Sequence, residues 1–115
     1  MLGSSIGGVT VATYAVTHTD DIKGIILQYP AIFLNEQAYE IGAEYDVNGY
    51  KNPVLFLQGD SDKVVPDKYS IELCDYYNSI DKNHCRMIIY NGKSHVFTGK
   101  YKVIAAKDIY EFINS

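Results

Sequence analysis

Three short apolar runs, separated by segments with helical periodicity, constrain the fold of this chain more than any other feature. The runs cover residues 24–29, 54–58 and 86–90 and consist mainly of aliphatic and aromatic side chains. Continuous apolar runs of this length are typical of strands that are buried on both faces, as in parallel sheets. The sequence therefore predicts three mainly parallel strands that are joined by right-handed crossovers and flanked by helices.

Helical segments precede, separate and follow these runs. Apolar residues recur at helical spacing over residues 8–18, 68–79 and 100–113, whereas residues 31–52 are predicted to form an irregular loop with a turn of helix. Asp67 is the predicted N-cap of the second helix. The residues expected on the inner faces of the three helices are Val9, Ala12, Ala15, Val16, Ile71, Leu73, Cys74, Tyr77, Val103, Ile104, Ile109 and Phe112.

Composition and charge argue against several classes of protein. The 115 residues suffice for a single domain with a buried core. The formal net charge is −4 and no cluster of Lys and Arg occurs, so we expect no nucleic-acid partner. No apolar run approaches the roughly 20 residues that cross a bilayer, and the first residues do not resemble a signal peptide. We expect no membrane partner.

The two cysteines, Cys74 and Cys85, are relevant to the cellular location of the protein. They could pair, but two buried thiols in a reducing environment are the more economical interpretation. We therefore expect a cytoplasmic location.

A Gly/Ser-rich motif opens the chain. The run Gly3-Ser4-Ser5-Ile6-Gly7 fits G-x-S-x-G and stands directly before the first predicted helix. In a sharp strand-to-helix turn, a Cβ at either flanking glycine is expected to collide with the neighbouring strand or helix. The turn would also leave the Ile6 N–H unpaired and directed at an oxyanion next to Ser5. Because Gly and Ser are common residues, the motif alone does not distinguish a nucleophile from a plain turn.

Two further polar motifs follow the second and third apolar runs. The run G-D-S-D-K-V-V-P contains Asp60 and Asp62, and the run G-K-S-H-V-F contains His95. Ligands of open α/β sheets bind at the carboxyl ends of the strands, so these side chains are candidate site residues. Asp60 is better explained as a turn residue that bonds to nearby backbone. His18 and His84 lie near a helix end and a helix-to-strand turn, and we expect them to be structural.

Together, the three motifs resemble the α/β-hydrolase superfamily, most closely its small esterase, dienelactone hydrolase and prolyl-oligopeptidase-like branches. The chain order Ser, Asp, His is the one described for that superfamily. The resemblance implies that Ser5 is the nucleophile, that Asp62 orients the base, and that His95 is the base. It also implies an oxyanion donor at the Ile6 backbone and no metal or organic cofactor. One departure is Gln58, which stands where His is frequent.

The activity implied by the resemblance is that of a serine hydrolase. The substrate would be a small carboxylic ester or related acyl compound, cleaved through an acyl-enzyme on Ser5. Esterases, thioesterases and peptidases share this constellation, so the acyl and leaving groups stay open. Tyr29, Pro30 and Phe33 follow the first apolar run and are candidates for lining the substrate pocket, although core packing explains aromatic residues equally well.

Only Met1 and Leu2 precede the Ser5 motif, whereas the nucleophile of the superfamily follows a central strand of a larger sheet. The resemblance thus implies that residues 1–115 form one truncated domain that starts at the nucleophile turn, with the N-terminal strands missing. The strand at 24–29 would then be an exposed edge through which the chain forms a homo-oligomer. Besides a weakly active hydrolase, two alternatives remain: a non-catalytic remnant that folds only by association with itself or the missing half, and a small binding module.

Overall fold

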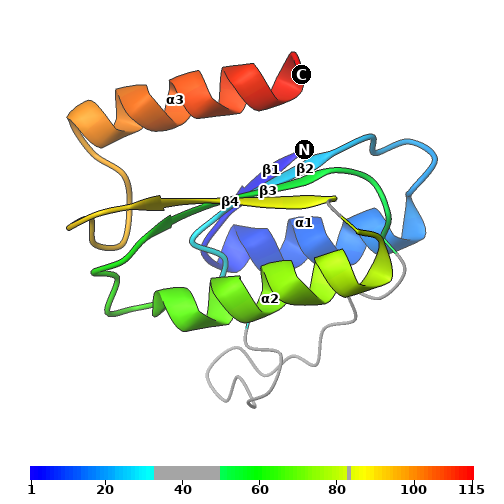
Figure 1. Ribbon diagram of the computed structural model, residues 1–115, viewed down its shortest axis with the longest axis horizontal. Helices are drawn as coiled ribbons and strands as arrows, with labels where there is room; N and C mark the ends of the chain where they lie inside the picture. The colour runs from blue at the N-terminus through cyan, green and yellow to red at the C-terminus, as the bar shows by residue number, and fades with distance from the viewer. Residues whose placement is uncertain (33–49, 83) are drawn as a thin grey trace.

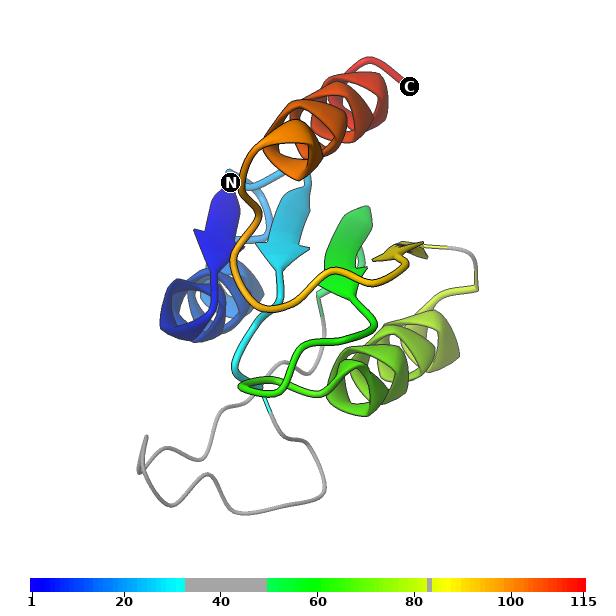
Figure 2. The same cartoon turned by 90° about the vertical axis from the view of Figure 1, so that its left-hand side faces the viewer.

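The computed structural model of the protein describes residues 1–32, 50–82 and 84–115. It consists of a four-stranded parallel sheet between two layers of helices (Figures 1 and 2). Helices α1 and α2 cover one face of the sheet, and α3 lies on the other face. The elements in chain order are β1 (Leu2–Ser4), α1 (Ile6–Thr17), β2 (Ile25–Gln28), β3 (Val54–Gly59), α2 (Asp67–Ile80), β4 (Cys85–Tyr90) and α3 (Lys100–Ile113).

The strand order is β1-β2-β3-β4, and all three predicted runs form parallel strands. The sheet has four strands rather than three because Leu2–Ser4 pairs with β2. The Ile26 N–H donates to the Met1 carbonyl at 2.8 Å, and the Ser5 N–H donates to the Gln28 carbonyl at 3.0 Å. The expectation that the strand at 24–29 is an exposed edge is therefore wrong: β1 covers it, and β1 and β4 are the outer strands of the described sheet.

Both faces of the central strands are buried, which explains their continuous apolar sequences. Leu27 and Phe56 belong to the core under α1 and α2, which also contains Tyr77. Leu57, from the same strand as Phe56, belongs to the core under α3, which also contains Ala105. Successive residues of a strand point to opposite faces, so each strand contributes to both cores.

The N-terminal half of α2 differs from its predicted form. The helix begins at Asp67, Pro66 occupies the N-cap position, and no side chain caps the helix, so the prediction of an Asp67 cap is wrong. The Asp67 carboxylate lies instead in the first turn, where the helix dipole favours negative charge. Ile71 is 42% exposed, and the inner face is formed in its place by Ser70, which is 1% exposed.

The inner face of α3 is also rotated from its predicted position. Val103 and Ile104 are exposed, whereas Ala105 is buried and Ile109 and Phe112 pack partly against the same core. Ala105 is two residues after Val103 and therefore lies on nearly the opposite side of the helix. The side that faces the sheet thus contains Ala105, Ile109 and Phe112 and not Val103.

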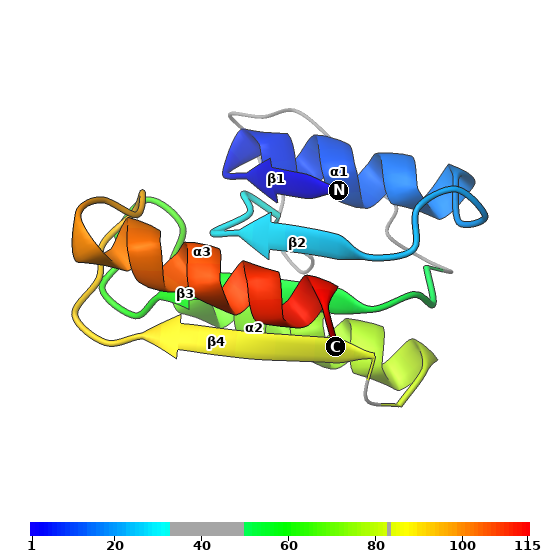
Figure 3. The same ribbon diagram turned by 90° about the horizontal axis from the view of Figure 1, so that it is seen from above.

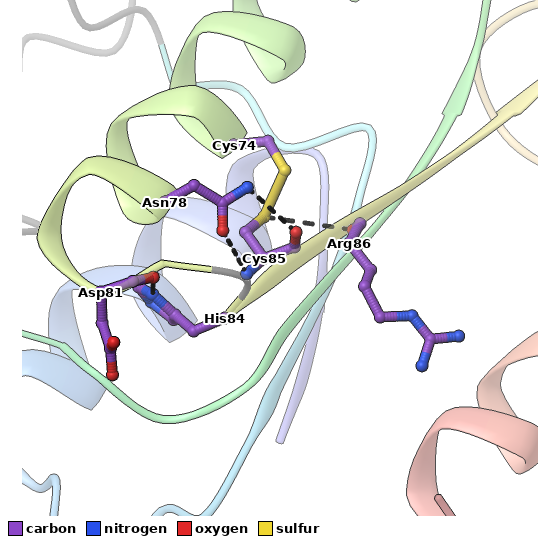
Figure 4. The surroundings of a disulfide bond; sticks show 6 residues. All are labelled: Cys74, Asn78, Asp81, His84, Cys85 and Arg86. Carbon is purple, nitrogen blue, oxygen red and sulfur yellow. Dashed lines mark hydrogen bonds between the residues drawn. A yellow bond between two sulfur atoms is a disulfide. The ribbon is translucent and has the colours of Figure 1, made fainter.

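Cys74 and Cys85 form a disulfide that joins α2 to the start of β4 (Figure 4). Their Cα atoms are 5.6 Å apart, within the usual range for a disulfide. Asn78, one helical turn after Cys74, supports the same junction: its Nδ2 donates to the Cys85 carbonyl, and its Oδ1 accepts the Cys85 N–H at 2.8 Å. The prediction of two reduced thiols is wrong because both side chains lie between the same helix and strand.

A cytoplasmic location, which rests on reduced thiols, loses that support and stays a prediction. Among the described residues, no helix combines the length and the apolar character that crossing a membrane requires.

We predict that reducing the disulfide destabilises the protein. The bond closes a short loop with a sequence separation of 11, for which loop-closure entropy gives a loss of about 3 kcal/mol in the free energy of unfolding. Urea unfolding with and without dithiothreitol measures this change. The double variant Cys74→Ser/Cys85→Ser is the control and is expected to be insensitive to the reductant. Equal unfolding midpoints for the wild type in both buffers would contradict the pairing.

Candidate active site

The candidate site lies at the edge of the sheet where the parallel strands end. Ser5 follows β1 directly, Asp62 follows β3, and His95 lies in the loop that leaves β4. All four arrows in Figure 3 point toward this edge, so the three segments meet there although they are far apart in sequence.

The structure brings the side chains of Ser5, Asp62 and His95 together. His95 Nδ1 is 2.7 Å from Asp62 Oδ2, and His95 Nε2 is 3.1 Å from Ser5 Oγ. Because Nδ1 faces a carboxylate, the proton belongs on Nδ1, which leaves Nε2 to accept from the Ser5 hydroxyl. The Asp62 side chain is fully buried and that of His95 is 16% exposed. This arrangement allows the serine proton to move to a neutral imidazole.

Backbone groups hold the Asp62 carboxylate. Its Oδ1 accepts the N–H groups of Val64 and Val65 at 2.9 and 2.8 Å. Its Oδ2 accepts from Gln58 Nε2 at 3.2 Å as well as from His95. Since both oxygens have two donors, the orientation of the carboxylate is fixed from several sides.

The Ser5 backbone adopts φ 53° and ψ −120°, outside the regions that most non-glycine residues occupy. Three hydrogen bonds hold this conformation. The Ser5 N–H donates to Gln28, and the Ser5 carbonyl accepts the N–H groups of Gly8 at 3.0 Å and Ala31 at 2.9 Å. The turn is thus held by β2, by the first turn of α1 and by the segment after β2.

Close packing at the turn involves Gly3 and Gly8. A Cβ on Gly3 would lie 2.4 Å from the Gly7 carbonyl oxygen, and one on Gly8 would lie 2.6 Å from the Pro30 Cβ. A Cβ on Gly7 would meet nothing within 4 Å, so the expected collision at this glycine is wrong. The reason is that Gly8, not Gly7, faces the end of β2.

Ile6 is the first residue of α1, so its N–H has no acceptor within the helix. No carbonyl elsewhere in the described parts of the chain accepts it. This donor stands directly after Ser5, as the sequence predicts for an oxyanion site.

Tyr29 and Pro30 lie beside the site, but in packed positions. The Tyr29 side chain is almost fully buried, and its ring centroid is 4.6 Å from that of His95 and 4.8 Å from that of Phe97. Pro30 is buried against the start of α1. Their surroundings favour the packing interpretation over pocket lining. Phe33 lies outside the described residues.

The loop that carries His95 is held at both ends. Tyr90, the last residue of β4, donates to Asp108 Oδ2 of α3 at 2.5 Å, and its ring meets Phe97 edge-on. Burial and the Asp108 carboxylate raise the pKa of Tyr90 well above its usual range, so the phenol stays a donor. Val96, next to His95, has φ 67°, which is rare for a β-branched residue.

The other polar candidates lie outside this group. Asp60 Oδ1 accepts the Gly92 N–H at 2.7 Å and so ties the β3 loop to the β4 turn. Nδ1 of His18 and of His84 bonds to a main-chain carbonyl three or four residues earlier. Within residues 1–32, 50–82 and 84–115, no cluster of three or more His, Cys, Asp and Glu side chains is arranged to hold a metal ion.

Two polar contacts of the site were not predicted from the sequence. Gln58 is fully buried beside Asp62, and Ser4 Oγ donates to Gln28 Oε1 at 2.8 Å next to the Ser5 turn. The sequence did contain a signal for the Gln58 contact, because a glutamine inside an apolar strand must find hydrogen-bond partners when it is buried.

Comparisons with known proteins define the class of fold. The structure resembles Est1E from Butyrivibrio proteoclasticus, with a TM-score of 0.72, 22% identity, and coverage of 100% of this chain and 61% of that one. A monoacylglycerol lipase from Paleococcus ferrophilus has a TM-score of 0.74 and 17% identity, with coverage of 96% of this chain and 66% of that one. An esterase from Thermogutta terrifontis has a TM-score of 0.72 and 18% identity, with coverage of 98% of this chain and 51% of that one. The fold is thus part of an α/β-hydrolase fold, as predicted. The chain spans less than two thirds of each of these relatives.

The family model of the prolyl oligopeptidase family matches residues 32–115. The chain therefore belongs to the prolyl oligopeptidase family, a family of serine hydrolases of the α/β-hydrolase class. The comparison with curated proteins gave no match.

We predict opposite effects of alanine at the two glycines of the motif. Gly3→Ala forces a Cβ against backbone and should lower the free energy of unfolding by about 1–3 kcal/mol or more. Gly7→Ala is its matched control, since the site is open and helical, and should stabilise by about 0.5–1 kcal/mol. Urea unfolding of both variants measures the difference, and equal destabilisation by the two would contradict the packing of this turn.

Proposed function

We propose that the protein is a serine hydrolase that cleaves a carboxylic ester or a related acyl substrate through an acyl-enzyme on Ser5. The observation that carries this proposal is the continuous hydrogen-bonded series from Asp62 through His95 to Ser5. Membership in the prolyl oligopeptidase family supports hydrolysis, and the esterases and lipase among the structural relatives support an ester substrate.

In the first step, Ser5 Oγ attacks the carbonyl carbon of the substrate while its proton passes to His95 Nε2. The carbonyl electron pair moves onto oxygen, and the Ile6 backbone N–H stabilises that oxyanion by donating a hydrogen bond to it. The imidazolium that forms is stabilised by the Asp62 carboxylate at Nδ1.

In the second step, the tetrahedral intermediate collapses and the bond to the leaving group breaks. His95 Nε2 returns the proton to the leaving oxygen, which departs as an alcohol and leaves the acyl group on Ser5. Water then attacks the acyl carbon of the acyl-enzyme while one of its protons passes to His95 Nε2. The bond between the acyl carbon and Ser5 Oγ breaks, His95 returns the proton to Ser5 Oγ, and the acid is released.

A fluorophosphonate probe is expected to label Ser5. Labelling should be absent in Ser5→Ala and about 1,000-fold slower or more in His95→Ala, because the base that removes the serine proton is lost. Mass spectrometry of the labelled peptide and the time course of labelling measure both effects. His18→Ala, a histidine variant outside the site, is the control and should label like the wild type. An unchanged rate in His95→Ala would overturn the proposal.

One observation favours a second candidate, a non-catalytic chain that associates through the sheet edge. Because Ile26 donates to Met1 and Ser5 donates to Gln28, the backbone groups of Leu2 face away from β2. Leu2 is 45% exposed, and no described strand pairs with the outer side of β1. An open edge with exposed apolar side chains favours pairing with another chain.

For this second candidate, we predict oligomers in size-exclusion chromatography with light scattering. Leu2→Pro should yield monomers, because proline removes the outward N–H without removing a bond to β2. Leu2→Ala, which keeps that N–H, is the control and should remain oligomeric. A folded wild-type monomer at all concentrations would exclude association through this edge.

A further inference from the structure

Gln58 is a fully buried polar side chain that the proposed mechanism does not use. It is the next-to-last residue of β3, after the apolar residues Phe56 and Leu57. Burial of an amide is unfavourable unless its donors and acceptor find partners. The contacts of Gln58 therefore indicate what this position requires.

Every polar atom of the Gln58 amide has a partner. Nε2 donates to Asp62 Oδ2 at 3.2 Å and to the Val65 carbonyl at 3.1 Å, and the Gly59 carbonyl lies at 3.2 Å. Oε1 accepts from Ser70 Oγ of α2 at 2.8 Å. The amide thus links the inner face of α2 to the carboxylate that contacts His95.

These partners leave one orientation for the amide. Nε2 is surrounded by three oxygen acceptors, so a flipped amide would place Oε1 against a carboxylate and two carbonyl groups. Ser70 is 1% exposed, and its hydroxyl donates to the opposite side of the amide. A single series of hydrogen bonds therefore runs from Ser70 through Gln58, Asp62 and His95 to Ser5.

We propose that Gln58, held by Ser70, is a positioning residue that orients the Asp62 carboxylate toward His95. This inference rests on the proposed function, because orientation of His95 matters only if that imidazole acts as the base. Asp62 Oδ2 accepts from both Gln58 and His95, whereas Oδ1 is held by backbone. The Gln58 amide supplies a side-chain donor that fixes the carboxylate on the same oxygen that His95 contacts.

Gln58→Glu separates positioning from simple space filling, because glutamate keeps the shape of glutamine. When the introduced carboxyl group is protonated, its O–H can still donate to Asp62. When that group is ionised, two carboxylates face each other at hydrogen-bond distance and repel. The variant therefore keeps a donor to Asp62 at low pH and loses that donor at high pH.

The first experiment measures the rate of fluorophosphonate labelling of Gln58→Glu relative to the wild type across a range of pH. We expect the ratio to fall about tenfold or more as the pH rises and the second carboxylate ionises, since bonds to charged groups are the strong ones. A ratio that does not change with pH, in a variant whose thermal unfolding shows it to be folded, would overturn the proposal.

Ser70→Ala tests the same series without altering the amide, and it serves if Gln58→Glu does not fold. Loss of the Ser70 donor leaves Oε1 of the buried amide without this partner and loosens its hold on Asp62, so we expect labelling to slow about three- to tenfold. Ser79→Ala is the matched control, because Ser79 lies on the same helix and its exposed hydroxyl donates to the Tyr76 carbonyl, away from Gln58. Equal labelling rates for the two folded variants would count against a role for Ser70.

Proton NMR gives a readout that does not depend on Ser5 chemistry. The His95 Nδ1 proton, when it is bonded to a carboxylate, resonates far downfield, and we expect its signal to shift or broaden in Gln58→Glu and Ser70→Ala but not in Ser79→Ala. If the wild type shows this signal, the signal changes in the variants as expected, and the probe does not label the wild type, the proposed hydrolase is refuted and the positioning role stays supported. An absent wild-type signal, or one that is the same in every folded variant, would overturn the positioning role.

Discussion

The parallel backbone pairing of β1 to β4 is the constraint on which the candidate site depends. It brings the ends of four strands to one edge, so short loops suffice to place side chains from three of them within hydrogen-bond distance. Packing at that edge is tight: a Cβ on Gly59 would lie 2.1 Å from the Lys93 carbonyl oxygen. The loops after β3 and β4 are therefore fixed against each other, which sets the distance between Asp62 and His95.

Local strain in the described chain is concentrated at the same edge. The non-glycine residues with positive φ are Ser5, Tyr29 and Val96, and each lies within one residue of a strand end or of His95. Such conformations persist only where the surrounding structure determines them, and they are frequent at functional sites. Here the hydrogen bonds of the Ser5 turn and the packing of Tyr29 against His95 and Phe97 supply that support.

Features that depend on local pattern were predictable from the sequence. The three apolar runs form strands, and Ser5, Asp62 and His95 follow strand ends. The strands β2 and β3 are buried on both faces as predicted, whereas the middle of β4, an outer strand of the described sheet, is only partly buried. Features that depend on packing between distant segments were not. The fourth strand is three residues long and exists through its bonds to β2. It is too short for a recognisable apolar run, and only the strand-to-helix motif that follows it indicates a strand there.

The same reason explains the disulfide and the rotation of the helices. Cys74 and Cys85 meet because α2 lies against β4, and Ser70 rather than Ile71 lies on the inner face, where its hydroxyl donates to Gln58. In each case the residue contacts a partner from another helix or strand, and the sequence around the residue alone does not predict that contact.

Trapping of an acyl group is the most direct measurement of the central claim, that Ser5 is a nucleophile aligned by His95 and Asp62. The protein would be mixed with p-nitrophenyl acetate, quenched in acid and digested for mass spectrometry of the peptide that contains Ser5. We predict one acetyl group on the Ser5 hydroxyl in the wild type and none on that peptide in Asp62→Ala under the same conditions. Acetylation at Ser4 instead, or equal acetylation of Ser5 in both proteins, would contradict the account.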